Sequence, residues 1–220
     1  SLNFGPLTHP DEMGADLEDV VTYLENDLQY KEHFKLVFQE NQIESAQVSR
    51  AISQYVRTLI SQDSKYDAWK KEEAEFNELE LKGYQLYQNN CASCHHEGLF
   101  TDLSFHNNGL DEDYPDPPEL EGLYQGRYRI TSDPEDLGAY KTPTLRNIEL
   151  TAPYMHDGRF ETLDEVLSHY QNGIQSNETV APQLISGIKL NPEENEALIA
   201  FLTTLTDSSF IQHHYQTAQY

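Results

Sequence analysis

The feature that most constrains this chain is the pentapeptide Cys91-Ala92-Ser93-Cys94-His95, which uses both of its cysteines. Two thiols separated by two residues, with a histidine directly after the second, form the attachment pattern of a c-type haem. Each sulfur can form a thioether with one vinyl group of the porphyrin, and the short loop then holds the next side chain beneath the iron. We therefore predict one covalently bound haem c on Cys91 and Cys94, with His95 as the proximal iron ligand.

Other uses of a paired-cysteine motif account for the motif less well than haem attachment does. A structural zinc site needs four ligands, usually with a second cysteine pair, and the sequence holds only 2 cysteines. A zinc site of two cysteines and two histidines, drawn from His95, His96 or His106, stays open as an alternative. A thioredoxin-like motif is expected in a βαβ context, which this sequence lacks, and a structural disulfide gives no reason for the histidine.

Length and charge limit the possible partners. A chain of 220 residues is long enough for one large domain, or one and a half smaller ones, with a core around a porphyrin. Its 38 acidic against 14 basic residues give a formal net charge of -24. This charge argues against nucleic acid or an anionic membrane surface as a partner. It suits cationic partners, although solubility alone explains it equally well.

The sequence also carries an expectation about location. No run approaches the roughly 20 apolar residues that a membrane span needs, and Ser1 to Pro6 has neither the basic nor the apolar region of a signal peptide. Because thioether attachment of haem implies export, we expect a mature periplasmic form, or a piece of one.

The hydrophobic pattern predicts a mainly α-helical fold. Apolar residues recur at helical spacing within residues 20–28 and, more cleanly, within 48–59. No strand pattern of any length competes with them. The stretch 70–80 is charged and reads as a linker that runs into a helix. We place Trp69 in this linker and interpret it as a packing residue.

Three later features refine this expectation. Gly83 lies in the helix before the haem motif, where it costs stability relative to alanine, so we expect another helix to approach it closely. Residues 97–141 read as a long loop that wraps a cofactor. Helix starts are indicated by the Thr162/Glu165 capping box and by Asn191-Pro192.

Further motifs flank the haem site in a fixed order. They are His9-Pro10-Asp11-Glu12-Met13-Gly14, Ala51 to Ile60, Tyr140 to Asn147 and Leu150 to Gly158. With these motifs, the chain from about Leu7 to Thr206 resembles the bacterial di-haem cytochrome c peroxidase family, which includes the MauG-type enzymes. Family members carry two haem sites, one in each of two cytochrome c-like domains, whereas this sequence has only the second.

The resemblance implies a domain organisation. We expect residues 1–72 to be the helical remainder of the domain that bears the peroxidatic haem, 73–210 to be a cytochrome c-like haem domain, and 211–220 to be a tail. The fold class is thus mainly α. The first haem domain was removed, lies on another chain, or never existed in a true one-haem relative; we favour its loss or separation, because the Glu12 motif would otherwise have no purpose.

The resemblance also implies roles for single residues. Glu12 matches the acidic residue over the peroxidatic haem, where a carboxylate would move a proton between the oxygens of peroxide. Arg146 and His156 resemble residues close to the haem edges, and a guanidinium can pair with a propionate. The alternatives are a surface arginine and a satisfied histidine between the two domains. Thr151 and Pro153 match positions whose backbone carbonyls help to hold calcium between two haem domains.

The sixth iron ligand is less well defined by the resemblance. The electron-transfer haem of the family commonly has a methionine there, but this sequence places Tyr170 at the matching position, as in the MauG-type enzymes. A phenolate would favour ferric iron, whereas methionine would raise the reduction potential. Met155, His169 and His106 are competing ligands, and Tyr170 as an ordinary core aromatic is the other alternative.

We accordingly expect a haem c oxidoreductase, the electron-transfer part of an enzyme that reduces hydrogen peroxide to water. Its electrons would come from a small donor, a cytochrome c or a copper protein, and would pass to a second haem-bearing domain or chain. The alternatives are a mono-haem electron carrier or sensor and a MauG-like oxidase of protein side chains. Homodimers are common in the family.

Overall fold

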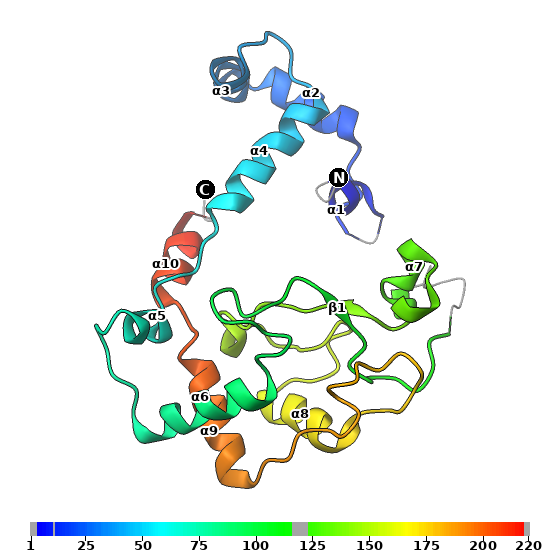
Figure 1. Cartoon of the computed structure of the whole chain (residues 1–220). Helices are drawn as coiled ribbons and strands as arrows, with labels where there is room; N and C mark the ends of the chain where they lie inside the picture. The colour runs from blue at the N-terminus through cyan, green and yellow to red at the C-terminus, as the bar shows by residue number, and fades with distance from the viewer. Residues whose placement is uncertain (1–3, 11, 116–122, 218–220) are drawn as a thin grey trace. The chain divides into compact units, whose positions relative to one another are not determined.

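The chain divides into two compact units, Ser1–Ile60 and Ser61–Tyr220. The computed structural model describes residues 4–10, 12–115 and 123–217, and Figure 1 traces its elements. The boundary between these compact units lies after Ile60, because the segment that follows Ile60 packs into the second unit. The domain boundary expected after residue 72 stays a prediction. Within the described residues, no helix is long and apolar enough to cross a membrane.

The first unit is helical and has a small core. Its helices are α1 (Phe4–Thr8), α2 (Leu17–Asn26), α3 (Leu28–Phe38) and α4 (Ser45–Thr58). Asp16 and Asp27 accept hydrogen bonds from the first N–H groups of α2 and α3, which is why these helices begin there. The core consists of Leu24, Ile43 and Val48, with Val20, Val21, Phe34 and Ile52 packed against them.

The second unit is also mainly α-helical, so the predicted fold class is confirmed. Its helices are α5 (Lys65–Lys70), α6 (Glu78–Asn90), α7 (Tyr128–Thr131), α8 (Leu163–Ser168), α9 (Pro192–Thr203) and α10 (Ser208–Thr217). Short 3-10 turns cover Leu123–Gln125, Pro134–Asp136 and Ile148–Leu150, and a π-helical turn covers His169–Gly173. The strands β1 (Phe105–His106) and β2 (Tyr140–Lys141) pair antiparallel, with Phe105 opposite Lys141.

Helices α6 and α9 cross each other closely and form the centre of this unit (Figure 1). Each begins at a capping box, Asn77 with Glu80 and Asn191 with Glu194. At the crossing, a Cβ atom added to Gly83 would lie 1.9 Å from the backbone oxygen of Ala197. Only a residue without a side chain fits there, so the predicted close approach at Gly83 is confirmed.

An aromatic core lies behind the haem motif. Its buried members are Tyr66, Phe76, Tyr87, Phe100, Leu167, Leu198, Phe201, Leu202 and Leu205. Trp69 packs on its edge and stacks on Phe76, with 4.4 Å between the ring centroids and 9° between the rings. The packing role expected for Trp69 is therefore correct, although the residue belongs to helix α5 rather than to a linker.

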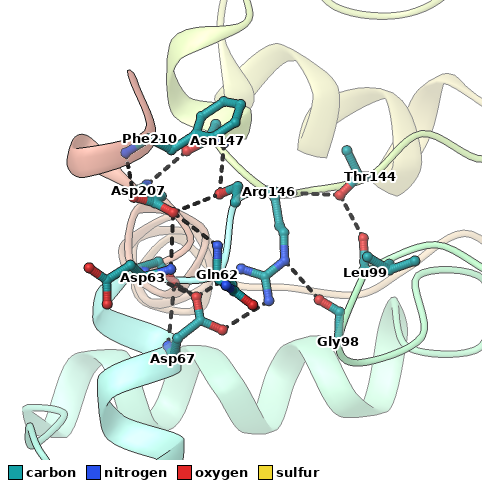
Figure 2. Close-up of polar contacts among 12 residues, drawn as sticks. Gln62, Asp63, Asp67, Gly98, Leu99, Thr144, Arg146, Asn147, Asp207 and Phe210 are labelled. Carbon is teal, nitrogen blue, oxygen red and sulfur yellow. Dashed lines mark hydrogen bonds and ion pairs between the residues drawn. The ribbon is translucent and has the colours of Figure 1, made fainter. Parts of the chain in front are cut away.

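Asp207 ties the beginning of this unit to its end. Its side chain is 1 % exposed, and one carboxylate oxygen accepts hydrogen bonds from the backbone N–H groups of Gln62 and Asp63 at 2.9 and 3.0 Å. The other accepts from Ser209 and the N–H of Phe210 (Figure 2). Residues 61–72 are thus joined to the second unit, and residues 211–217 continue α10 rather than forming a tail.

The segment predicted as a long loop is held by a buried amide. Asn107 is 2 % exposed, its side-chain carbonyl accepts from Gly109 N–H and Tyr114 Oη at 2.8 Å, and its NH2 group donates to Thr179 at 2.8 Å. These bonds satisfy the amide and hold the loop around Asn107 beside the segment that contains Thr179.

Candidate haem-binding site

The two cysteines lie on one tight turn at the end of α6. The backbone N–H groups of Cys94 and His95 both donate to the carbonyl of Cys91, at 3.2 and 2.9 Å. This turn brings both sulfurs and the imidazole to the same short segment, as attachment of one porphyrin requires. Both thiols are free.

Burial makes the environment of the two thiols non-activating. Burial raises the pKa of Cys91 to about 12, and burial also raises the pKa of Cys94. A zinc site or a redox-active pair needs thiolates, which form beside cations or helix N-termini. Both thiols are thus protonated in the protein alone, which argues against a redox-active pair.

His95 is oriented by its own loop and by a distant segment. Its Nδ1 lies 3.1 Å from the carbonyl oxygen of Phe100 and 3.2 Å from that of Pro143. Because both partners are acceptors, Nδ1 carries the hydrogen, and Nε2 keeps the lone pair that a metal requires. Burial also lowers the pKa of His95, which favours the neutral, ligating imidazole. The adjacent His96 is exposed, so the structure distinguishes the two histidines.

Tyr170 lies close to the haem motif from another part of the chain. It belongs to the π-helical turn His169–Gly173 that follows α8, and such turns are frequent at functional sites. Burial raises the pKa of Tyr170, a hydrogen bond with Asn108 opposes this, and the nearby Cys91 and Cys94 raise it further. Tyr170 thus lies in the neighbourhood of the two attachment residues, and its role as the sixth iron ligand stays a prediction.

The competing ligands have other partners. His169 Nε2 lies 3.0 Å from the carbonyl of Asn108, and the amide of Asn108 is 3.5 Å from Met155 Sδ. His106 Nε2 lies 2.7 Å from a carboxylate oxygen of Asp102. Both histidines thus use Nε2 within the protein, while Met155 stays near Tyr170 through Asn108.

Cys94 belongs to a group of side chains that could bind a metal ion. Cys94, Asp102 and His106 offer ligand atoms that all lie within 4.8 Å of one another. Burial would raise the pKa of Asp102, but hydrogen bonds led by that with His106 lower it to about 2. A structural zinc ion needs a fourth protein ligand, and within the described ranges this group holds three.

Arg146 has a different partner from the one expected. Its Nη1 and Nη2 donate to the two carboxylate oxygens of Asp67 at 2.8 and 2.9 Å, and its Nε donates to the carbonyl of Gly98 at 2.8 Å (Figure 2). The guanidinium is thus engaged by protein carboxylate and carbonyl groups, so contact with a propionate stays a prediction. Sequence reasoning missed Asp67, whose pairing across 79 positions leaves no local signal.

His156 packs against an aromatic ring near β2. Its ring lies parallel to that of Tyr140, with centroids 3.7 Å apart and 11° between the planes. Burial lowers the pKa of His156, and the neighbouring carboxylates of Asp157 and Asp111 oppose this change. His156 is exposed, and its role at a haem edge stays a prediction.

The remaining predicted residues are exposed. Glu12 belongs to the first unit, where its backbone N–H donates to the carbonyl of His9 at 3.0 Å. Thr151 ends the 3-10 turn Ile148–Leu150 and its hydroxyl donates to Ile148 at 3.2 Å. Pro153 follows two residues later. The peroxide role of Glu12 and the calcium roles of Thr151 and Pro153 stay predictions.

Comparison with known proteins agrees with this geometry. A family model described as di-haem cytochrome c peroxidase matches residues 2–75, and one described as cytochrome c matches residues 81–206. The chain is 33% identical to the cytochrome c551 peroxidase of Nitrosomonas europaea and 32% identical to the methylamine utilization protein MauG of Methylorubrum extorquens. These matches cover 92% and 91% of this chain but only 57% and 56% of those proteins. The chain thus spans little more than half the length of the curated relatives it matches.

Solved structures give the same answer for the fold. A MauG-like protein associated with microbial copper homeostasis is 34% identical and superposes with a TM-score of 0.81, over 96% of this chain and 69% of that one. The diheme peroxidase BthA of Burkholderia thailandensis, at 19% identity and a TM-score of 0.72 over 96% of this chain and 64% of that one, shares the fold. The chain therefore belongs to the family of di-haem cytochrome c peroxidases and MauG-like proteins, and its residues 81–206 form a cytochrome c domain.

Proposed function

We propose that this chain is the electron-transfer part of a periplasmic di-haem enzyme that reduces hydrogen peroxide to water. The observation that carries the proposal is the arrangement at the haem motif. Cys91 and Cys94 lie on one turn, and His95 donates from Nδ1 so that Nε2 can bind iron. Haem c on this turn would accept and release one electron at a time. The protein's own part is to attach it, orient its ligand and surround it with an apolar core.

The first unit supports a second haem-bearing domain as partner. Its small core leaves large apolar side chains exposed, namely Leu28, Leu36, Val37, Tyr55 and Val56. A groove of about 320 Å³ between α3 and α4 is lined by Tyr30, His33, Phe34, Val37, Phe38, Arg50, Ala51 and Gln54. Apolar surface of this kind usually marks an interface, and its proposed occupant is a second haem domain like that of the longer relatives.

Three further roles belong to the same proposal. Glu12 would transfer a proton between peroxide oxygens once that second haem is present. The carbonyls of Thr151 and Pro153 would contribute to a calcium site, completed by ligands from outside this chain. The net charge of -24 favours a cationic electron donor, such as a small cytochrome c or copper protein.

Tyr170 is the proposed sixth ligand, and its replacement gives a sharp expectation. Burial keeps the phenol protonated in the protein alone, and a ferric iron would reverse this preference. Since a phenolate favours ferric iron, Tyr170→Phe should abolish the His/Tyr features of the ferric spectrum and raise the reduction potential. Tyr154→Phe, which removes another tyrosine hydroxyl of this unit, should change neither property. An unchanged ferric spectrum in Tyr170→Phe would exclude Tyr170 as the sixth iron ligand.

The activity itself is tested on the full-length protein with both haems. Reduced cytochrome c or reduced copper protein is mixed with the enzyme, and its oxidation is followed with and without hydrogen peroxide. The proposal predicts oxidation that depends on both peroxide and enzyme. Absence of any such oxidation would exclude the peroxidase function.

Two alternatives have observations in their favour. The position of Tyr170 beside both cysteines favours a MauG-like oxidase of protein side chains, which would convert a protein substrate while leaving small donors untouched. The presence of one haem motif in this sequence favours a mono-haem carrier or sensor. Such a carrier would exchange electrons with its partners but show no peroxide chemistry.

A further inference from the structure

We propose that Asp67 and Arg146 form a clamp that holds the carbonyl of Pro143 against His95 and thereby sets the reduction potential of the haem. This inference rests on the proposed attachment of haem at Cys91 and Cys94. In this proposal Arg146 positions the carbonyl of Pro143 instead of binding a haem propionate. Asp67, which the sequence did not single out, holds Arg146 in place.

Arg146 joins helix α5 to the loop that follows the haem motif. Its two terminal nitrogens contact Asp67, and its Nε contacts the carbonyl of Gly98 (Figure 2). The two side chains of the ion pair are only 10% and 12% exposed. A planar guanidinium that uses three of its donors in this way fixes both partners in direction as well as in distance.

The residues around Pro143 are fastened to the same loop. Thr144 Oγ1 donates to the carbonyl of Leu99 at 2.6 Å, and Thr101 Oγ1 donates to the carbonyl of Thr142 at 2.7 Å. With the bond from Arg146 to Gly98, these contacts enclose Pro143. Its carbonyl oxygen lies 3.2 Å from His95 Nδ1, so the position of this acceptor depends on the contacts around it.

Arg146 also lies beside the second acceptor of His95. The carbon of its guanidinium group lies 5.6 Å from the ring centroid of Phe100, and the backbone carbonyl of Phe100 is 3.1 Å from His95 Nδ1. One side chain therefore supports both segments that accept from the imidazole.

The Asp67 end of the clamp is itself rigid. The backbone N–H and the hydroxyl of Ser64 donate to one of its oxygens at 3.0 and 2.7 Å, which forms the capping box of α5. Burial would raise the pKa of Asp67, but the hydrogen bonds from Arg146 and Ser64 lower it to about 2. The carboxylate is thus charged at neutral pH, and removal of either charged partner would leave the other unpaired in a buried place.

The clamp has a consequence for redox chemistry. An acceptor at Nδ1 increases the basicity of a metal-binding imidazole and fixes the orientation of its ring. A more basic imidazole stabilises ferric iron relative to ferrous iron. Loosening of the clamp should therefore raise the reduction potential of the haem on Cys91 and Cys94, without any change in the ligands.

The test is the midpoint potential of this haem in the full-length holoprotein. Arg146→Lys keeps the charge but loses the planar fork, and Asp67→Asn keeps the shape but loses the charge. Both should shift the potential upward by the equivalent of roughly a tenfold change in the ferrous-to-ferric ratio, about 59 mV for one electron. The Nδ1 proton of His95 should also exchange with solvent faster in both variants, as measured by NMR.

Lys65→Gln is the matched control. Lys65 lies on the same short helix, and its replacement removes a similar contact, the 2.6 Å ion pair with Glu80. The contacts described for Lys65 are with Glu80 and Phe76 and lie outside the loop after His95. Its potential should equal that of the wild type. A haem-bearing Asp67→Asn or Arg146→Lys protein with wild-type potential and exchange would overturn the clamp. Absence of covalent haem in the wild type would instead overturn the proposed function.

Discussion

Replacement of His95 by alanine is expected to leave the haem attached through both thioethers but without its proximal ligand. In the full-length enzyme, peroxide turnover should fall by on the order of 100-fold or more, since loss of an outer-shell partner alone typically costs 10–100-fold. The physical reason is local. The carbonyls of Phe100 and Pro143 both accept from Nδ1, so Nε2 of this one imidazole would be available to the iron.

The adjacent His96 provides the control for this experiment. It is exposed, whereas His95 is held by two carbonyls, so His96→Ala should retain the wild-type ferric spectrum and turnover. The ferric spectrum, the turnover rate and the haem content are measured for both variants, and they show which of the two histidines binds the iron. Equal behaviour of the two variants would show that the iron takes its ligand from elsewhere.

Replacement of Gly83 by alanine should destabilise the second unit by roughly 3 kcal/mol, at the upper end of the usual cost of overpacking. Alanine ordinarily stabilises a helix by about 1 kcal/mol relative to glycine. Here the added Cβ would lie 1.9 Å from the Ala197 oxygen and 2.8 Å from Phe201 Cβ. Since the first of these atoms is backbone of α9, the two helices must move apart. Urea unfolding of the holoprotein measures the loss.

Gly5→Ala is the comparison for this change. Gly5 lies within α1, and a Cβ atom there would meet nothing within 4 Å. Its replacement should be neutral or slightly stabilising. A stabilising effect of Gly83→Ala, equal to that expected for Gly5→Ala, would contradict the close crossing of α6 and α9.

Local features of this protein were predictable because their signals are local. The capping boxes at Thr162 and Asn191 begin α8 and α9 as expected, since cap and partner lie three residues apart. Gly83 indicated a helix crossing because a glycine inside a helix needs compensation. The haem motif was predictable for the same reason, since its chemistry is contained in five consecutive residues.

Long-range features were not predictable from the pattern. The unit boundary depends on Asp207, which binds Gln62 and Asp63 across about 145 positions of sequence. The partner of Arg146 lies 79 residues away. A carboxylate has the same composition and spacing whether it caps a helix, faces solvent or pairs with a distant guanidinium, so only the folded structure distinguishes these roles.

The central claim is that this chain carries haem c on Cys91 and Cys94, and an intact mass of the native protein tests it most directly. The account predicts the polypeptide mass plus one haem for this haem motif, retained under denaturing conditions and lost in the Cys91→Ser, Cys94→Ser double variant. It further predicts a second haem on an attached or co-purifying segment. A native mass equal to that of the bare polypeptide, or a stoichiometric zinc ion in place of haem, would contradict it.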